Sequence, residues 1–284
     1  MAKKALIFYK KSAFSIYFQD PESSFRKGKK IDSSEFLKFK SMHETHQQSL
    51  LCVERILKSF HFKTKRMARG RSFHASDYDL VVTVGGDGTF LEASHNIQSQ
   101  LILGVNSDPS RSVGRFCSAD IKNFAQIVEG FLYGKSKVFE YPRLEVVLPH
   151  VRTCFLNDIL VCHSNPAAMS RYVITIDHQS EEQKSSGIWI STAAGSSGAN
   201  QSAGGRRFPP TRRLIQYRPR ELYANKATPY RLKGGVLSIE QDLMVTSMMR
   251  EGVMFVDGSH MSFSFEYGVQ LKIKPFKYPL RVLS

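Results

Sequence analysis

The first 132 residues alternate short apolar runs with segments in which apolar side chains recur at helical spacing. Three runs are almost wholly apolar: residues 5–9, 80–84 and 101–105. Residues 43–60 and 120–132 predict helices with one apolar face, and residues 89–97 fit a short helix. Residues 20–42 are polar and lysine-rich, and we expect a loop there. Near-continuous aliphatic runs are typical of parallel strands covered on both faces, so the pattern predicts a parallel sheet flanked by helices.

The pattern changes to consecutive strands further along the chain. Residues 137–192 contain four apolar, β-branched stretches in close succession. Residues 253–265 predict a hairpin, because Asp257-Gly258 can supply the positive φ angles of a turn between strands. We therefore predict an α/β domain followed by a mostly β domain. The boundary is expected within 133–142, giving an α/β domain over 1–140 and a β-rich domain over 141–267.

The composition is that of an ordinary globular protein, with 42% hydrophobic and 23% charged residues. No run approaches the ~18 apolar residues that span a bilayer. The basic pair Lys3-Lys4 precedes only five apolar residues, too few for a secretory signal. We therefore expect a cytoplasmic protein without a membrane partner. The four cysteines form no CxxC pair, which fits reduced thiols better than a zinc site.

A net charge of +15 implies attraction to polyanions such as nucleic acid or small polyphosphates. Basic residues gather in two clusters, 63–71 and 206–220, which are equally compatible with plain solvated surfaces. A nucleic-acid-binding module would need aromatic residues interleaved with these clusters and a known motif, and neither is convincing. The charge alone therefore does not decide the function, and we expect no nucleic-acid partner.

The second apolar run of the chain, residues 80–84, leads into a glycine loop, "GGDGT", at residues 85–89. Strand, glycine turn and helix together aim backbone N–H groups at an anion, and Gly85, Gly86 and Gly88 let the backbone approach it closely. The loop is neither a G-x-x-x-x-G-K-[ST] motif nor a G-x-G-x-x-G motif. It therefore predicts phosphate handling of another kind.

Asp87 is the unusual residue of this loop, because phosphate repels a carboxylate. Two unit charges about 4 Å apart interact with roughly 4 kcal/mol at an effective dielectric near 20. The carboxylate is explained if it takes a proton from an attacking hydroxyl, or if it helps to hold Mg²⁺ beside the phosphates. Alternatively, Asp87 is a solvent-facing residue that caps the helix at Thr89.

Two segments of the second half carry further candidate binding residues. Asn157 and Asp158 interrupt an apolar strand, and such groups need a ligand, a bulge or a neighbouring strand to satisfy them. Residues 185–205 pass from a strand into small hydroxyl-bearing residues that allow close approach of a ribose or a base; the alternative is a flexible loop. A nucleophile elbow is excluded, because it would need glycine where Ala199 stands.

Taken together, these motifs closely resemble the NAD kinase family in order and spacing, over about residues 80–265. The "GVNSDPSRSVG" and "SSGIWISTAAGSS" segments look most like the branch with plant NADH kinase and animal mitochondrial NAD kinase. The matching motifs are Gly85 to Thr89, Gly104-Val105-Asn106, Asn157-Asp158, Ser191-Thr192 with Gly195-Ser196, and Ala203-Gly204-Gly205.

The resemblance implies a two-domain kinase that transfers the γ-phosphoryl of ATP to the 2′-hydroxyl of the adenosine ribose of NAD⁺ or NADH, giving NADP(H). Asp87 would be the general base. The implied substrate- and phosphate-binding residues are Gly85, Gly86, Gly88, Thr89, Phe90, Asn106, Asn157, Asp158, Thr192, Ser197 and Gly198. Mg²⁺ would be held mainly by the ATP phosphates. A homodimer or homotetramer is implied, as is packing of residues 268–284 back onto the first domain.

Three positions depart from the family pattern and bear on the choice between NAD⁺ and NADH. Ser186 stands where the family usually has aspartate, Asp158 replaces a glutamate, and Ala199 replaces an aromatic residue. The alternative is a lipid kinase of the diacylglycerol or sphingosine type, which shares the Gly-Gly-Asp-Gly loop. Against it stand the Asn157-Asp158 pair, the segment 191–205 and the lack of an evident apolar lid.

Overall fold

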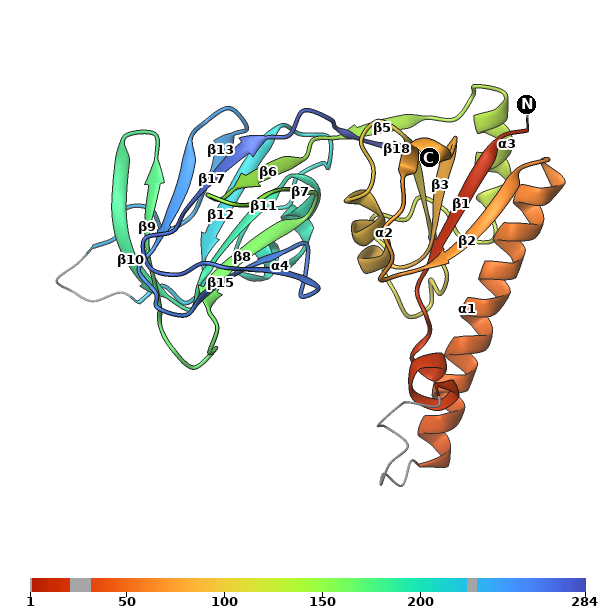
Figure 1. The fold of residues 1–284 in the computed structure, drawn as a ribbon, viewed down its shortest axis with the longest axis horizontal. Helices are drawn as coiled ribbons and strands as arrows, with labels where there is room; N and C mark the ends of the chain where they lie inside the picture. Colours follow the sequence, from red (N-terminus) through yellow and green to blue (C-terminus); the bar gives the residue numbers. More distant parts are fainter. Residues whose placement is uncertain (1, 21–31, 224–228) are drawn as a thin grey trace. The chain divides into compact units, whose positions relative to one another are not determined.

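The computed structural model describes residues 2–20, 32–223 and 229–284. The chain divides into two compact units, Met1–Phe139 with Arg281–Ser284, and Glu140–Leu280. The first unit is α/β with a mostly parallel sheet, and the second consists of antiparallel strands (Figure 1). The predicted fold class is therefore confirmed.

The sheet of the first unit has the strand order β2-β1-β3-β4-β18-β5. Its strands are β1 (Lys4–Tyr9), β2 (Lys63–Ala68), β3 (Leu80–Gly85), β4 (Leu101–Asn106), β5 (Val138–Tyr141) and β18 (Leu280–Leu283). Its helices are α1 (Ser33–Ser59), α2 (Asp87–Ser94) and α3 (Phe124–Leu132), with short turns η1 (Ser15–Gln19) and η3 (Ala75–Asp77). The central strand β3 is buried along its whole length, as its aliphatic sequence predicts.

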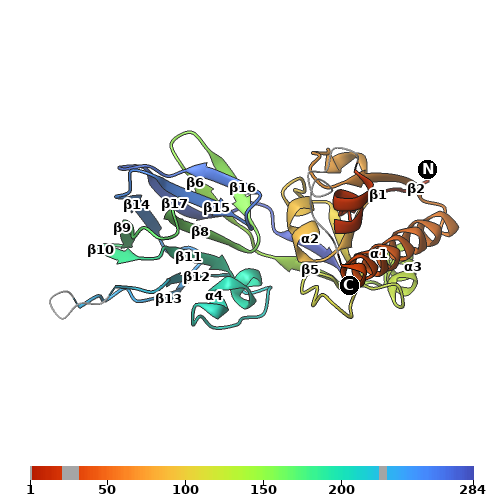
Figure 2. The same ribbon diagram turned by 90° about the horizontal axis from the view of Figure 1, so that it is seen from below.

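Helices cover both faces of this sheet. Side chains of α1 and α3 pack with alternate residues of the strands, such as Val82 and Leu103, in one apolar cluster. The intervening residues face the other side, where Phe90 of α2 lies close to Gly104 of β4. Figures 1 and 2 show α2 on the opposite face of the sheet from α1 and α3.

The second unit is a sandwich of two antiparallel sheets. Their strand orders are β10-β9-β14-β17-β6-β7 and β13-β12-β11-β8-β15-β16. The strands and turns are β6 (Leu144–Val147), β7 (Arg152–Phe155), β8 (Asp158–His163), β9 (Ser170–Ile176), β10 (Gln179–Ser185), β11 (Ile188–Thr192), η4 (Ala194–Ser197), α4 (Ala199–Ser202), β12 (Leu214–Pro219), β13 (Gly235–Ser238), β14 (Leu243–Ser247), β15 (Gly252–Val256), β16 (Met261–Ser264) and β17 (Gln270–Pro275). One apolar cluster takes residues from both sheets, among them Tyr172 and Ile190.

The expected loop over residues 20–42 is wrong in its second part. Residues 33–42 form the first turns of α1, and residues 21–31 lie outside the described residues. The apolar face of α1 starts late, because most side chains before residue 43 are exposed. The sequence therefore lacks the apolar periodicity that would have predicted a helix over these residues. Strand β2 was not expected either, because it lies at the edge of the sheet, none of its residues is buried and half of them are basic.

The return of the chain to the first unit is shorter than expected. Of residues 268–284, only the last strand, β18, joins the first sheet, where it pairs with β4. Residues 270–275 form β17, which pairs with β14 and β6 inside the second unit. The expected hairpin at 253–265 is confirmed, since β15 and β16 pair antiparallel and Asp257 and Gly258 have φ of 49° and 111°.

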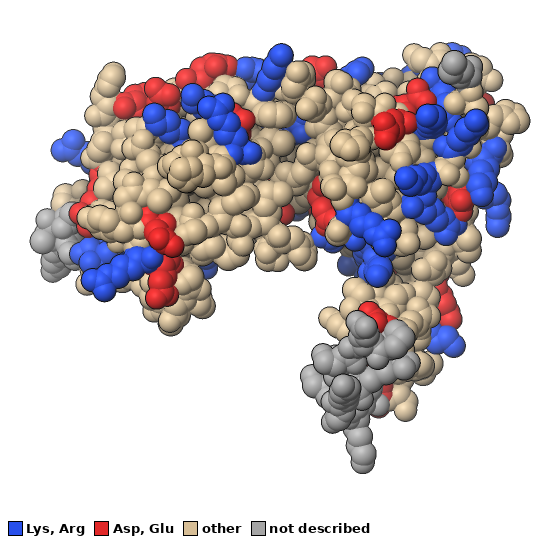
Figure 3. Space-filling model, viewed as in Figure 1, with Lys and Arg blue, Asp and Glu red and all other residues tan. Residues whose placement is uncertain are grey.

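On the face drawn in Figure 3, Lys and Arg side chains lie in several groups, and Asp and Glu side chains lie beside some of them. Within the described ranges, no helix has the length and apolar character needed to cross a membrane. All four cysteines are free thiols.

Candidate active site

The glycine loop of the first unit lies at the carboxyl edge of the parallel sheet. Strand β3 ends at Gly85, which is in register with Asn106 at the end of β4. Gly86 is the N-cap of α2, which begins at Asp87. A Cβ atom on Gly85 would overlap Oγ1 of Thr89, so glycine leaves room for the Thr89 side chain at the passage from strand to helix. In open α/β sheets this edge is where ligands bind.

Some backbone N–H groups of the glycine loop are used within the loop, and others are left for a ligand. Thr89 and Phe90 donate their N–H groups to the carbonyl of Gly86, and both side chains are buried. The N–H groups of Asp87 and Gly88, in the first turn of α2, make no hydrogen bond to any described residue. Thr89 and Phe90 therefore shape the loop, and Asp87 and Gly88 present donors that suit an anion.

The Asp87 carboxylate is fixed from one side. Its Oδ1 accepts a hydrogen bond from the N–H of Phe116 at 2.8 Å, and the residue is half-buried. Its Oδ2 has no hydrogen-bond partner among the described residues. Because Gly86 is the N-cap and no side chain caps the helix, the interpretation of Asp87 as a solvent-facing cap does not hold.

The segment after β4 holds Asp87 in place. Asn106 Nδ2 donates to the carbonyl of Ser112 at 2.8 Å, and its Oδ1 accepts from the N–H of Asp108 at 3.1 Å. Asn106 thus organises the loop that follows it. The ring of Phe116 stacks on Phe90 of α2 with centroids 5.4 Å apart. This stack places the Phe116 N–H beside the Asp87 carboxylate.

A neutral thiol lies close to the same carboxylate. Burial, with a smaller effect from the Asp87 charge, raises the pKa of Cys117 to about 12. The thiol is therefore protonated at neutral pH and does not compete with Asp87 as a base or nucleophile.

In the second unit, a carboxylate clamps the Asn157-Asp158 pair. Asp257 Oδ1 accepts the N–H groups of Asn157 and Asp158 at 2.7 and 3.2 Å, and its Oδ2 accepts that of Leu156 at 3.0 Å. The N–H of Asp257 donates in return to the carbonyl of Asp158 at 2.8 Å. Sequence reasoning used Asp257 only as a turn residue. Its role as a clamp depends on the pairing of β15 with β8, which a local motif does not reveal.

Asp158 is deeply buried, at 4% exposure. Burial, and next the charge of Asp257, raises the pKa of Asp158 to about 7. Asn157 Nδ2 donates to Asp158 Oδ2 at 3.1 Å. The cross-strand partner of Asp158 is Ser191, whose buried Oγ has no hydrogen-bond partner in the described structure. Partly unsatisfied polar groups at one spot suit a polar ligand.

The turn after β11 packs directly against this pair. Thr192 Oγ1 donates to the carbonyl of Leu156 and accepts from the N–H of Gly195. A Cβ on Gly195 would overlap the carbonyl oxygen of Asn157, so only glycine permits this approach. A Cβ on Gly198 would lie 3.5 Å from Asp158 Oδ2. The predicted residues Asn157, Asp158, Thr192 and Gly198 therefore lie together, and Ser197 belongs to the same turn η4.

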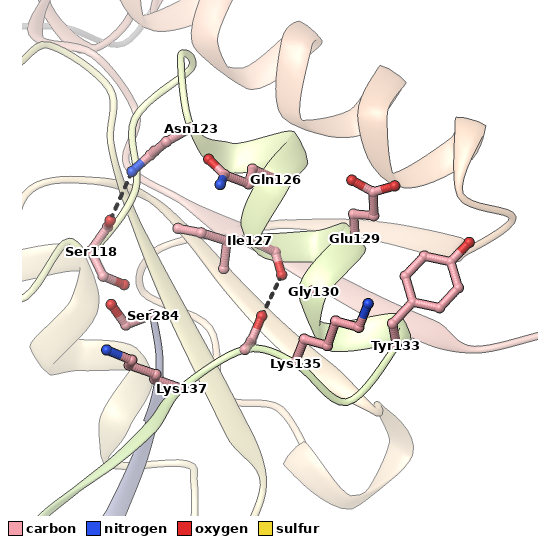
Figure 4. Close-up of a pocket in the computed structure, with 11 residues that line it drawn as sticks. Ser118, Asn123, Gln126, Ile127, Glu129, Gly130, Tyr133, Lys135, Lys137 and Ser284 are labelled. Atoms are coloured by element: carbon pink, nitrogen blue, oxygen red, sulfur yellow. Dashed lines mark hydrogen bonds between the residues drawn. The ribbon is translucent and has the colours of Figure 1, made fainter.

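The first unit also has a hollow. It has a volume of about 670 Å³ and lies beside α3 (Figure 4). Several polar side chains around it are bonded within the wall; Asn123 donates to the carbonyl of Ser118, and Ser136 to that of Ile127. None of the predicted site residues lines it.

Comparisons with known proteins point to one enzyme family. The family model for the ATP-NAD kinase N-terminal domain matches residues 18–136. A probable NADH kinase of Oryza sativa subsp. japonica is 36% identical over 231 residues, covering 73% of this chain and 71% of the relative. The NADH kinase of Arabidopsis thaliana is 32% identical over 256 residues, covering 81% and 80%.

Two solved structures share the fold. An NAD kinase from Archaeoglobus fulgidus in complex with ATP has a TM-score of 0.73 at 21% identity, covering 99% of this chain and 93% of its own. The yeast NADH kinase complexed with NADH also has a TM-score of 0.73, at 16% identity, covering 100% and 84%. These relatives do not favour the lipid-kinase alternative. The chain therefore belongs to the NAD kinase family and is an NAD(H) kinase.

Proposed function

We propose that this enzyme transfers the γ-phosphoryl group of ATP to the 2′-hydroxyl of the adenosine ribose of NAD(H), giving NADP(H) and ADP. Family membership supports NAD(H) phosphorylation in general, and the A. fulgidus relative is bound to ATP. The position of the accepting hydroxyl and the residue roles below are the finer part of the proposal.

The observation that carries the proposal is the half-anchored carboxylate of Asp87. With Oδ1 fixed by the Phe116 N–H, Oδ2 remains to accept the proton of the ribose hydroxyl. As that proton leaves, the hydroxyl oxygen forms a bond to the γ-phosphorus, and the bond from phosphorus to the β,γ-bridging oxygen breaks. The transition state of such transfers is loose, so positioning and charge neutralisation dominate over covalent chemistry.

The polyphosphate would be bound by the backbone of the glycine loop. The N–H groups of Asp87 and Gly88 supply donors, while Gly85, Gly86 and the buried side chain of Thr89 keep the loop in shape. Asn106 acts by holding the segment that carries Phe116.

Mg²⁺ fits this donor set only as an ion shared with substrate. Among the described residues, no three His, Cys, Asp or Glu side chains gather closely enough to bind a metal. Mg²⁺ is commonly bound through substrate phosphates and waters with few protein ligands, so the ATP phosphates would supply most of its ligands here. When bound with ATP, the ion would neutralise charge on the phosphates.

The dinucleotide would be bound in the second unit by Asn157, Asp158 and the turn containing Thr192, Ser197 and Gly198. These groups offer an amide, a carboxyl and closely packed small residues, a combination suited to ribose hydroxyls and base edges. A homo-oligomeric state and a cytoplasmic location stay predictions.

Replacing Asp87 with Asn tests the central role. With ATP–Mg²⁺ and NAD⁺ or NADH in parallel, a coupled dehydrogenase would detect NADP(H) from the wild type. We expect about a 10²- to 10⁴-fold loss of kcat in Asp87→Asn, the usual contribution of a general base, with an unchanged unfolding midpoint.

A 2′-deoxy analogue of NAD is the matched control and should give no product. Product from the analogue would contradict the choice of hydroxyl, and wild-type turnover by Asp87→Asn would contradict the role of the carboxylate. Running both dinucleotides also measures the preference between oxidised and reduced substrate.

A further inference from the structure

Arg69, a member of the basic cluster 63–71, lies at the same sheet edge as the glycine loop. It directly follows β2, and its N–H donates to the carbonyl of Tyr9 at 2.9 Å, extending the pairing of β2 with β1. Because β1, β2 and β3 are parallel, their carboxyl ends meet at one edge. Arg69 is thereby brought to the edge where β3 ends in Gly85.

The guanidinium of Arg69 is aimed by a carboxylate on α2. Its Nε donates to Glu92 Oε2 at 2.6 Å, and the N–H of Gly70 donates to Glu92 Oε1 at 2.6 Å. Glu92 therefore holds both the side chain and the backbone of this segment. A Cβ on Gly88 would lie 3.5 Å from Nη1 of Arg69, so the guanidinium lies against the first turn of α2.

Most of the hydrogen-bonding capacity of Arg69 is unused. Nε is committed to Glu92, which leaves four N–H groups on Nη1 and Nη2. In the described parts of the chain, these make no hydrogen bond. The side chain is 24% exposed, so it is partly desolvated but open to a ligand. A planar guanidinium with free terminal N–H groups matches the geometry of phosphate oxygens.

Arg69 also places a cation near Asp87, where bound phosphates would otherwise meet only a carboxylate and backbone N–H groups. A carboxylate beside phosphates is repelled by them, and the backbone donors of the loop carry no full charge. The guanidinium beside Gly88 is a full positive charge; its Nε is paired with Glu92, and its terminal N–H groups remain for phosphate oxygens.

We propose that Arg69 binds the polyphosphate of the nucleotide at the glycine loop, and that Glu92 is a positioning residue that aims it there. This inference rests on the proposed function and adds to it a cation from outside the glycine motif. The ligand is a nucleoside triphosphate, and Arg69 contacts its phosphates rather than its base.

The chain contains a matched control on the same strand. Arg66 of β2 forms an ion pair with Glu54 of α1, with a similar partial exposure of both side chains. Arg66 thus carries the same charge and the same kind of helix contact. Glu54 belongs to α1, which covers the sheet face opposite α2. Arg66→Gln and Arg69→Gln therefore each remove one positive charge and one ion pair, so any difference between them reports on position.

The first experiment compares Arg69→Gln with Arg66→Gln in steady-state kinetics. We expect Arg69→Gln to raise KM for ATP about 10- to 100-fold, the loss typical of a charged hydrogen-bonded contact, with KM for NAD(H) within about 3-fold of wild type. Arg66→Gln should match the wild type in both constants. Calorimetric binding of ATP and of inorganic tripolyphosphate to Asp87→Asn, with and without Arg69→Gln, should show the same loss for both ligands.

The second experiment tests the aiming by Glu92. Glu92→Gln should raise KM for ATP by less than Arg69→Gln does, and the double variant should equal Arg69→Gln. Thermal unfolding midpoints of Arg69→Gln and Arg66→Gln should agree, since each loses one partly exposed ion pair.

The inference is overturned if Arg69→Gln keeps the wild-type KM for ATP, if it weakens ATP but not tripolyphosphate, or if KM for NAD(H) rises equally. It is also overturned if Arg66→Gln has the same effect. A failure of the proposed function looks different, because the wild-type enzyme would then make no NADP(H) while still binding ATP through Arg69.

Discussion

The two units build their binding residues in opposite ways. In the first unit, a contiguous loop at the end of β3 carries the glycines and Asp87, and the fold adds Phe116 as an anchor. In the second unit, segments distant in the chain meet: the Asn157-Asp158 pair, the turn after β11, and Asp257. The site in the first unit is formed by one continuous segment with few contacts to the rest of the unit. The site in the second unit is formed by separate segments whose backbones are in direct contact.

This difference predicts how each site tolerates change. In the first unit, an added atom at Gly85 meets the side chain of Thr89, which can rotate. At Gly195 an added atom meets the backbone of Asn157, which cannot yield without moving β8. Alteration of the second site should therefore be transmitted into the sandwich core, while alteration of the first should stay local.

The largest expected effect is the loss of stability when alanine replaces Gly195, compared with the same change at Gly85. Gly195→Ala should lower the free energy of unfolding by roughly 3 kcal/mol or more, because the new methyl group overlaps a main-chain carbonyl. Gly85→Ala should cost about 1 kcal/mol, since rotation of Thr89 relieves most of the overlap. Urea unfolding of both variants gives the comparison. Equal losses would mean that the two sites are equally rigid.

The next effect removes the charge of the clamp. Asp257→Asn keeps the size of the side chain but leaves only one carbonyl oxygen for the three N–H groups of Leu156, Asn157 and Asp158. We expect a loss of about 2–3 kcal/mol in unfolding free energy and a raised KM for NAD(H), with KM for ATP nearly unchanged. Urea unfolding and steady-state kinetics measure both. An equal rise in both KM values would contradict a clamp that acts on the dinucleotide residues alone.

A smaller, pH-dependent effect concerns Asp158. Its folded-state pKa of about 7 lies above its usual value of 3.8, so the unfolded chain loses this proton first. Stability from this group therefore declines as pH rises from about 4 to 7. Asp158→Asn should remove that decline, being on the order of 2 kcal/mol more stable than wild type at pH 8 and nearly equal at pH 4. Denaturant unfolding at both pH values tests this; a pH-independent difference would contradict it.

The smallest expected effect concerns His46 of the first unit, whose contribution to stability falls as pH falls, opposite to that of Asp158. Burial, and next the charge of Lys10, lowers the pKa of His46 to about 4, and His46 Nε2 bonds to the carbonyl of Lys10 at 2.9 Å. The unfolded chain takes up this proton first, so the contribution is lost as pH falls from about 6.5 to 4. An NMR titration should show the His46 ring neutral down to about pH 4. A midpoint near 6.5 would mean that the ring is solvated.

The same contrast explains what the sequence could predict. The Gly85–Thr89 loop was recognisable because strand, glycines and helix follow one another, and its chemistry needs little else. Asp257 was recognisable only as a turn residue, because its partners lie about a hundred residues earlier. The resemblance to a known family supplied the roles of Thr192, Ser197 and Gly198, which no local pattern specifies. Arg69 was hidden within a basic run, since charge count does not reveal which guanidinium faces α2.

Strand β18 has a consequence for biogenesis. It lies between β4 and β5, yet it is synthesised after all of the sandwich. During translation, the edge of β4 that pairs with β18 stays unpaired while about 170 further residues are synthesised. The first sheet is therefore expected to be completed only after residues 280–283 have been synthesised, which is after the whole sandwich.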